Sequence, residues 1–382
     1  MKIDKKKLIP YGVALIVILG VIFIFLHPML SGKIIAQPDI IQHAGMSKEV
    51  NDYYKQTGEQ AFWTSRLFSG MPTYLISMRY NDILVSKLDK VFTLFLHPHM
   101  GYIFLLFVGF LFLMKVLKLD TWISIIAALA FTLSSYFIII LQVGHTSKLH
   151  AIGYMAPYLA SVILIYQKKY KWGALLATLF LALNIRSNHL QITYYLAIIT
   201  LFVAIYYTII YIKKKDWKHI GWATSIMVVT TIVGALLNFS LMYVTNEFSK
   251  ETTRGKSELS IAENTKGLDK DYITQWSYGV DETMTFLIPN FKGGVSDRIA
   301  TVSPKSLTAA DREWREAVAS WEAYWGTQPF TSGPVYIGAV VMLIFFVSLA
   351  FIWKNKLSIP LMLVTILAIL LAWGRNFMPL TN

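Results

Sequence analysis

The residues of this chain that could do chemistry lie between its apolar segments. Asp39 follows the first of these segments, in Gln37-Pro38-Asp39-Ile40-Ile41-Gln42. A carboxylate at this place could act as a general base on a hydroxyl group or hold a metal ion. It could equally be a solvated loop acid or a helix cap after Pro38. On residue type and position alone, Asp39 is a candidate base with these alternatives open.

Two short clusters combine a histidine with a cation three residues away. His145 and Lys148 precede one apolar segment, and Arg186 and His189 interrupt another. Residues at this spacing share one face of a helix. Lys148 could hold a lipid phosphate as a point charge or extend to the membrane interface. Arg186 suits bidentate phosphate binding, with Asp39 as its alternative partner within the chain. The histidines lack a compact metal-ligand spacing, so no metal ligand is assigned.

Aromatic residues accompany these candidates in two long polar segments. Trp63 precedes the turn sequence Ser69-Gly70-Met71-Pro72, and the second segment contains Arg254 together with several tryptophans. Tryptophan stacks on sugar rings, but it also favours the interface between membrane and water. Either interpretation fits Trp63.

Composition indicates an integral membrane protein. Of the 382 residues, 55% are hydrophobic and 15% are charged. Several runs reach the ~20 apolar residues that cross ~30 Å of hydrocarbon. A net charge of +13 would suggest nucleic acid in a soluble protein, but here the excess lysines lie in short turns between apolar runs. The absence of cysteine excludes disulfides and thiolate nucleophiles. We expect an all-α polytopic membrane protein that contacts the lipid bilayer and no nucleic acid.

The apolar runs predict about nine transmembrane helices. The stretch 172–212 is too long for one helix, so it predicts a hairpin with Asn184–His189 at its outer tip. The lysine-rich turns place the N-terminus in the cytoplasm and the reactive residues outside. Outer loop one covers about 28–98 and outer loop two about 245–332, within a single domain over residues 1–382. The predicted spans are 8–27, 99–116, 121–142, 150–166, two within 172–212, 220–243, 333–353 and 357–373.

In their order and placement, these segments resemble the YfhO-type bacterial membrane proteins, relatives of the GT-C glycosyltransferases that use lipid-linked sugars. The resemblance covers most of the chain. The residues that carry it are Asp39 with Gln42, Trp63 with Ser69-Gly70-Met71-Pro72, Gly144-His145-x-x-Lys148, His189-Leu190-Gln191-Ile192-Thr193-Tyr194-Tyr195, Arg254-Gly255-Lys256-Ser257-Glu258-Leu259 and Ile288-Pro289-Asn290-Phe291-Lys292-Gly293-Gly294.

The resemblance implies a GT-C-like bundle in the bacterial plasma membrane, with its active site at the extracytoplasmic surface. It also implies a polyprenyl-phosphate sugar as donor and an envelope glycopolymer or glycolipid as acceptor. Asp39 occupies the place of the family's catalytic base. The motif contains one acid, whereas a metal site of this kind would use two neighbouring carboxylates. The resemblance therefore does not firmly imply a metal cofactor. Family members are longer than this chain, so we expect it to be an N-terminal portion, truncated at its C-terminus.

The resulting hypothesis is an inverting sugar transfer. Asp39 is the base, and Gln42 and Trp63 position the substrate. Two other classes remain open: a polytopic transporter or lipid-sugar flippase, and a non-catalytic envelope-assembly subunit. Transporters place polar groups near the middle of the membrane, whereas these lie at the outer ends of the spans. The residues expected to bind the donor phosphate are Lys148, Arg186, His145, His189 and Arg254.

Overall fold

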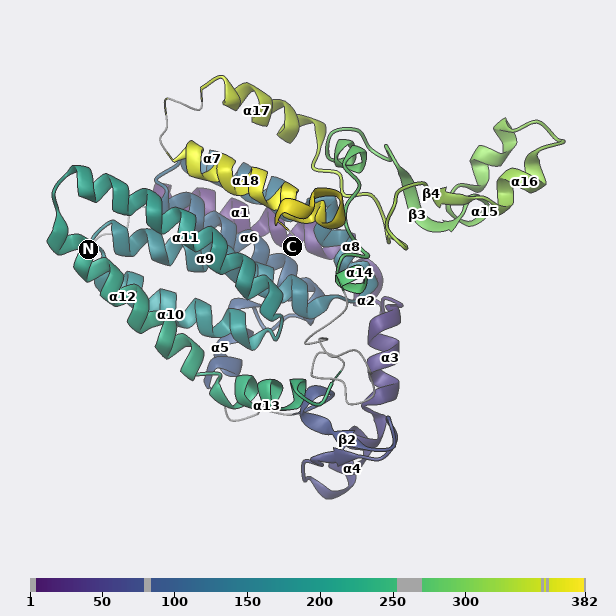
Figure 1. The fold of residues 1–382 in the computed structure, drawn as a ribbon, viewed down its shortest axis with the longest axis horizontal. Helices are drawn as coiled ribbons and strands as arrows, with labels where there is room; N and C mark the ends of the chain where they lie inside the picture. Colours follow the sequence, from purple (N-terminus) through teal and green to yellow (C-terminus); the bar gives the residue numbers. More distant parts are fainter. Residues whose placement is uncertain (1–4, 79–83, 253–269, 352–353, 355–356, 381–382) are drawn as a thin grey trace. The chain divides into compact units, whose positions relative to one another are not determined.

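The computed structural model describes residues 5–78, 84–252, 270–351, 354 and 357–380, which are predominantly helical (Figure 1). They form two compact units. Unit 1 comprises Met1–Leu133 and Ile140–Lys250, and unit 2 comprises Ser134–Ile139 and Glu251–Asn382. The Arg254 candidate and the motif that begins with it lie outside the described residues.

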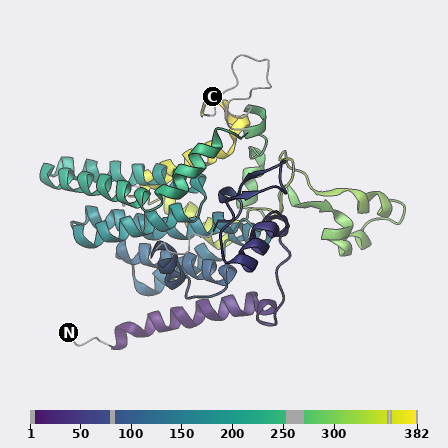
Figure 2. The ribbon, with the colours of Figure 1, turned by 90° about the horizontal axis from the view of Figure 1, so that it is seen from below.

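Unit 1 is a bundle of long apolar helices. Figure 2 shows its layers, with α1 beside α6 and α7, and with α9 and α10 between these and α12. The helix α8 (Ser135–Val143) begins in unit 2 and ends in unit 1. The other long helices of unit 1 are α1 (Lys5–Phe25), α6 (Pro98–Val116), α7 (Thr121–Thr132), α9 (Thr146–Tyr166), α10 (Tyr170–Arg186), α11 (Leu190–Lys213), α12 (Trp217–Leu236) and α13 (Phe239–Ser249).

The centre of this bundle is α9, whose side chains are mostly buried. It approaches α6 closely because small residues line their contact. A Cβ atom at Gly109 would lie 2.9 Å from the carbonyl oxygen of Gly153, so a larger residue would push the helices apart. The side chains of Tyr154, Ile165 and Leu183 are fully buried in the core that α9 and α10 share.

The predicted first outer loop contains several short elements. They are α2 (His27–Leu30), α3 (Pro38–Met46), α4 (Lys48–Thr57), β1 (Trp63–Thr64), β2 (Met71–Pro72), η1 (Thr73–Leu75) and α5 (Leu84–Phe92). The two strands pair in antiparallel fashion, with Trp63 opposite Pro72. The Thr64 hydroxyl donates a hydrogen bond to Glu49 of α4, which fixes the hairpin on that helix.

Five helices of the described chain are long and apolar enough to cross a membrane. A sixth results if α7 and α8, bent by 41° at a short break, form one span. These helices support the prediction of an α-helical polytopic membrane protein, whereas the count of nine is not confirmed. The five are Leu8–Phe25, Pro98–Val116, Thr146–Tyr166, Leu190–Lys213 and Trp217–Leu236.

Two predicted spans differ in their bounds from the helices found. The expected span 220–243 is interrupted between α12 and α13, where the Asn238 side chain donates to the Ala182 carbonyl oxygen at 2.9 Å. In the expected span 333–353, the helix α17 (Ala339–Leu349) begins later. The residues before α17 make other contacts: the Tyr336 amide donates a hydrogen bond to the Ser135 hydroxyl at 2.8 Å.

Unit 2 contains most of the predicted second outer loop and two apolar helices. Its strands β3 and β4 pair in antiparallel fashion. The carboxylate of Glu282, which is 4% exposed, accepts hydrogen bonds from the Tyr324 hydroxyl at 2.9 Å and the Gln328 amide at 3.3 Å. The elements are α14 (Lys270–Ile273), η2 (Asp281–Phe286), β3 (Gly293–Arg298), α15 (Ile299–Val302), η3 (Pro304–Ala309), α16 (Arg315–Ser320), β4 (Glu322–Tyr324), α17, α18 (Ser358–Ala372) and η5 (Gly374–Leu380).

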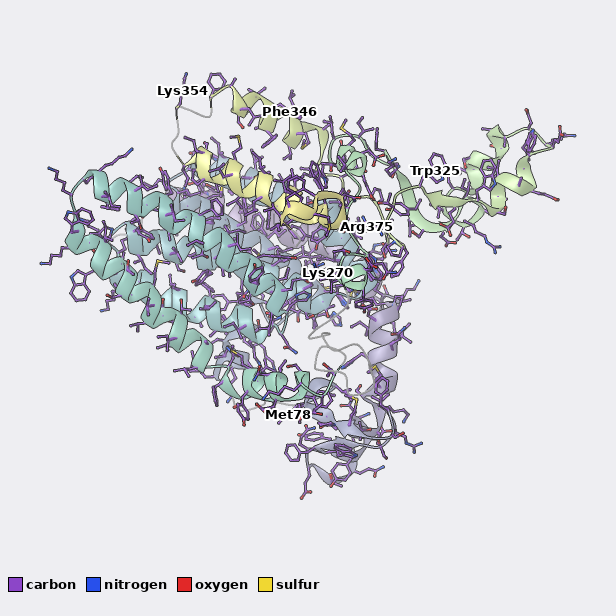
Figure 3. All side chains as sticks on the ribbon, viewed as in Figure 1. Met78, Lys270, Trp325, Phe346, Lys354 and Arg375 are labelled. Atoms are coloured by element: carbon purple, nitrogen blue, oxygen red, sulfur yellow. The ribbon has the colours of Figure 1, made fainter. Side chains whose placement is uncertain are left out.

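The aromatic motifs of the second loop bind the end of α18 and the segment that follows it. The Tyr278 amide donates to the Ala372 carbonyl oxygen at 2.8 Å, and the Arg375 amide donates to the Ser277 hydroxyl at 2.8 Å. Arg375 and the exposed Trp325 are labelled in Figure 3. These contacts give the sequence around Ser277 and Tyr278 a structural role within unit 2.

Candidate functional site

Three helix ends meet at one end of unit 1. The helices α9 and α10 run in opposite directions, as do α10 and α11, so the start of α9 lies beside the end of α10 and the start of α11. Asn184 joins them. This fully buried side chain donates to the Ala151 carbonyl oxygen at 2.8 Å and accepts from the Thr193 hydroxyl at 2.8 Å. The helix ends held in this way carry Lys148, Arg186 and His189.

Asp39 contacts His145, far away in the sequence. Asp39 lies in the first turn of α3, and its Oδ2 atom is 3.1 Å from the Nε2 atom of His145. Both side chains are about half exposed, at 49% and 46%. The carboxylate is therefore accessible to a substrate and has an imidazole partner.

The contact between Asp39 and His145 depends on Gln37 and Gly144. The Gln37 side chain is 1% exposed, donates to the Leu141 carbonyl oxygen and accepts from the Nε2 atom of His99 at 2.9 Å. Gly144 has a φ of +104°, and a Cβ atom there would lie 3.2 Å from the Gln37 Cβ and 3.3 Å from the Asp39 Cβ. A glycine allows the turn before α9 to touch the start of α3. His145 follows directly and reaches Asp39.

Lys148 and His145 lie close to His189. Burial lowers the pKa of His189, and the positive charge of Lys148, then that of His145, lowers it further. Because the ordinary pKa of histidine is about 6.5, His189 is neutral at pH 7. Its Nδ1 atom is buried without a hydrogen-bond partner among the described residues. We call Asp39, His145, Lys148 and His189 the Asp39 cluster.

Arg186 lies near an acid that the sequence did not single out. Its charge acts on Asp89 of α5, a helix that packs against α10. Asp89 Oδ1 accepts hydrogen bonds from His150 Nε2 at 2.6 Å and from the Tyr154 hydroxyl. Burial raises the pKa of Asp89, but these hydrogen bonds and the charges of His150 and Arg186 together hold it below its usual value. Asp89 is therefore an anion inside the bundle.

Sequence reasoning missed Asp89, although a signal for it exists. The apolar residues Val85, Leu88 and Phe92 lie at helical spacing, and Asp89 shares their face of α5. An acid on the apolar face of a helix needs a buried partner. His150 and Tyr154 supply it, but only the folded chain identifies them.

The two residues expected to position the substrate lie in different places. Gln42 is exposed on α3, one turn after Asp39 and on the same side of that helix. Trp63 lies in the β1–β2 hairpin, where its indole ring covers Gly70 so tightly that a Cβ atom there would be 2.7 Å from Cζ2. The ring is still 60% exposed. The structure thus brings Gln42 to Asp39 and ties Trp63 to its own turn.

The Asp39 cluster combines an accessible carboxylate with cationic and imidazole groups. Such a set can accept a proton at Asp39 and bind an anion at Lys148, and Arg186 at the neighbouring end of α10 adds a second cation. Within the described part of the chain, no group of three or more histidine, aspartate or glutamate side chains is arranged to hold a metal ion.

Comparison with family models, curated proteins and solved structures gives no match for this chain. The resemblance to the YfhO-type proteins therefore stays a prediction.

Proposed function

We propose that the chain is a membrane glycosyltransferase that moves a sugar from a polyprenyl-phosphate donor to an envelope glycopolymer or glycolipid. Its place is the outer surface of the bacterial plasma membrane, within a GT-C-like bundle of about nine spans. The observation that supports this function is the half-exposed Asp39 carboxylate in contact with His145. It lies at the end of unit 1 that also carries Lys148, Arg186 and His189.

In this proposal, Asp39 acts on the acceptor. The acceptor oxygen attacks the anomeric carbon of the sugar, and the bond from that carbon to the phosphate oxygen breaks with inversion. Asp39 takes the acceptor proton, and the phosphate leaves with the bonding electron pair. His145 holds the carboxylate in place. General base catalysis of this kind contributes about 10²–10⁴-fold in rate.

The cations act on the leaving group. Lys148 and Arg186 offset the charge that grows on the phosphate, as fixed cations do for other leaving anions. Neutral His189 contributes a hydrogen bond instead of a charge. Arg254, outside the described residues, keeps the phosphate-binding role predicted for it. Gln42 lies on the acceptor side of Asp39, and Trp63 offers an exposed ring to a sugar.

The test measures transfer of the sugar from a polyprenyl-phosphate-linked donor in membranes that contain the Asp39→Asn variant. We expect transfer to fall by about 10²–10⁴-fold at normal protein levels, because the amide cannot accept the proton. Asp39→Glu should restore part of the rate. Asp52→Asn is the matched control, because Asp52 is an exposed helical acid with its own partner, Lys48. Unchanged transfer in Asp39→Asn would remove Asp39 as the base.

One observation favours a transporter or lipid-sugar flippase as a second candidate. The buried pair of Asp89 and His150 is the kind of group that carries protons through a transporter. That function predicts substrate movement that is lost in Asp89→Asn and kept in Asp39→Asn. A non-catalytic assembly subunit predicts that alanine is tolerated at Asp39, Lys148 and Arg186.

A further inference from the structure

Two histidines flank the first residue of α6. Pro98 begins this helix, and a proline favours an extended backbone in the residue before it, as His97 shows with φ −54° and ψ 140°. The imidazole rings of His97 and His99 stack with their centres 4.8 Å apart. Their Nδ1 atoms are 3.1 Å apart. The start of α6 therefore brings two imidazole nitrogens together.

The buried Gln37 side chain fixes the position of the proton on His99. The amide nitrogen of Gln37 donates to the Leu141 carbonyl oxygen, and its Oε1 atom accepts from His99 Nε2 at 2.9 Å. A neutral imidazole carries one N–H group, so the Nδ1 atom of His99 has a free lone pair. Histidines that bind metal ions are oriented in the same way, by a hydrogen bond from their other nitrogen to an oxygen of the protein.

The backbone that carries the two histidines is held in place. The Phe95 amide donates to the Lys90 carbonyl oxygen at 2.8 Å. The Leu96 amide donates to the Thr93 carbonyl oxygen at 3.1 Å. After the pair, a Cβ atom at Gly101 would lie 2.8 Å from the Thr93 Cβ, so α6 packs tightly on this turn. The two imidazoles thus lie close together before any ligand binds, which lowers the cost of ordering them.

The separation of the two Nδ1 atoms suits one transition-metal ion. Two nitrogens at ~2.0–2.1 Å from a tetrahedral zinc ion lie roughly 3.3–3.4 Å apart, close to the 3.1 Å found here. The His97 ring is exposed and does not cap α6, so it can turn its lone pair toward an ion. Without an ion, one proton lies between the facing nitrogens. When an ion takes its place, that proton moves to the Nε2 atom of His97.

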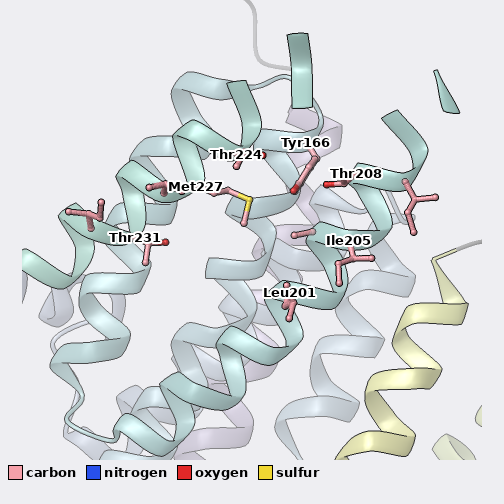
Figure 4. A pocket seen from close by; sticks show the side chains of 11 residues that line it. Tyr166, Leu201, Ile205, Thr208, Thr224, Met227 and Thr231 are labelled. Carbon is pink, nitrogen blue, oxygen red and sulfur yellow. The ribbon is translucent and has the colours of Figure 1, made fainter. Parts of the chain in front are cut away.

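The cavity between α11 and α12 offers a cation no comparable ligand (Figure 4). Its volume is about 560 Å³. The described residues that line it are aliphatic residues, a methionine, three threonines and Tyr166. The histidine pair lies instead near Asp39, because Gln37 and Asp39 both lie against Gly144.

We propose that His97 and His99 bind one divalent transition-metal ion through their Nδ1 atoms, with Gln37 orienting His99. Imidazole suits Zn²⁺, Ni²⁺ and Cu²⁺, whereas Mg²⁺ and Ca²⁺ prefer oxygen ligands. Water completes the coordination, because the described part of the chain brings no third histidine or acid to the pair. The site does not depend on the proposed sugar transfer, since metal binding is measured without donor or acceptor.

The probe is Cu²⁺, added to the full chain in lipid nanodiscs after purification without a polyhistidine tag. Electron paramagnetic resonance counts the imidazole nitrogens on the ion, and titration gives its affinity. We expect one tight site per chain with two imidazole nitrogens, which excess Mg²⁺ does not displace. Any other number of imidazoles at the tightest site overturns the proposal, and so does displacement by Mg²⁺. The wild-type spectrum decides this even where a variant fails to fold.

Two alanine variants give the matched comparison. His97 and His27 are both exposed, and the His27 ring bonds only to the nearby Ile24 carbonyl oxygen among the described residues. Loss of a group that merely orients a metal ligand costs about 10–100-fold in affinity, so loss of a ligand in His97→Ala should cost at least about 100-fold. His27→Ala should bind Cu²⁺ as the wild type does. Equal affinities in the two variants refute the site.

A third variant tests the role of Gln37. We expect Gln37→Leu to weaken Cu²⁺ binding about 10–100-fold while the spectrum still shows two imidazole nitrogens. A loss of one imidazole from the spectrum would make Gln37 necessary for the position of His99 itself, which also supports the site. Unchanged affinity overturns the orienting role of Gln37.

Discussion

The two aspartate–histidine pairs of unit 1 differ in how deeply they are buried. Asp39 and His145 are half exposed, so they can exchange protons with a substrate or with water. Asp89 and His150 are mostly enclosed and bonded at 2.6 Å. The same two residue types therefore serve different purposes: the first pair is available for chemistry, and the second holds α5 on α9 and places an anion beside Arg186.

The pKa of His189 measures how close Lys148 is. Removal of that charge in Lys148→Gln should raise the pKa of His189, although burial still keeps it below the ordinary value. Because the folded pKa is depressed, the protein loses stability as the pH falls below the ordinary histidine value, and the loss should be smaller in Lys148→Gln. NMR titration of labelled imidazoles, with His189→Gln for assignment, measures the shift.

Lys171→Gln is the control for that shift, because Lys171 lies at the opposite end of α10 from Arg186. It should leave the His189 titration unchanged. An unchanged His189 pKa in Lys148→Gln would show that the two side chains do not interact, and the phosphate site would lose its geometry.

At the scale of elements, apolar length predicts helices well and their polar breaks less well. The expected span 99–116 corresponds to α6, and the expected hairpin within 172–212 corresponds to α10 and α11. Its tip is shorter than the predicted Asn184–His189, because Asn184 and Arg186 still belong to α10 and only residues 187–189 form the turn. From the sequence, Asn184 is predicted to be a loop residue. In the structure, its amide is satisfied by α9 and α11, which a sequence pattern cannot reveal.

Residue type and position between apolar segments single out Asp39, His145, Lys148 and His189 as candidates from the sequence alone. The contact between Asp39 and His145 was not predictable, because it depends on the Gly144 turn and on the buried Gln37. Asp89, on which the charge of Arg186 acts, was also missed. Asp89 and His150 lie in separate helices, and only the packing of α5 against α9 and α10 brings them together.

Asn184→Leu tests the junction of the three helices. It leaves the Ala151 carbonyl and the Thr193 hydroxyl without their buried partner. A hydrogen bond between helices of a membrane protein contributes on average well under 1 kcal/mol, whereas a buried polar group without a partner costs about 1–3 kcal/mol in proteins generally. We therefore expect a loss of about 1–2 kcal/mol in unfolding free energy. Thermal unfolding in detergent measures it. Asn246→Leu on the exposed face of α13 is the control, and equal stability of the two variants would contradict the role of Asn184.

At the scale of the whole molecule, a count of nine spans needs α10, α17 and α18 to cross the membrane in addition to the five candidate helices and the bent pair. The shortest of the three are α17 and α18. These helices have 11 and 15 residues, which correspond to about 16 Å and 22 Å of helical rise. A bilayer core of about 30 Å is longer than either. The nine-span topology needs both to cross, with the help of the residues that flank them, and it places Lys354 in the cytoplasm. A hairpin that enters from outside and returns would leave Lys354 on the outer side.

A single-cysteine variant decides between these arrangements, because the natural chain has no cysteine. The proposed topology predicts that Lys354→Cys reacts with a membrane-impermeant maleimide only after the cells are permeabilised. His43→Cys on exposed α3 should react in intact cells, and Lys169→Cys in a lysine-rich turn should not. Reaction of Lys354→Cys in intact cells, with Lys169→Cys protected, would reduce the span count and keep the Asp39 cluster outside. Reaction of Lys169→Cys in intact cells would reverse the orientation and remove the proposed transferase, because its donor and acceptor lie outside the cytoplasm.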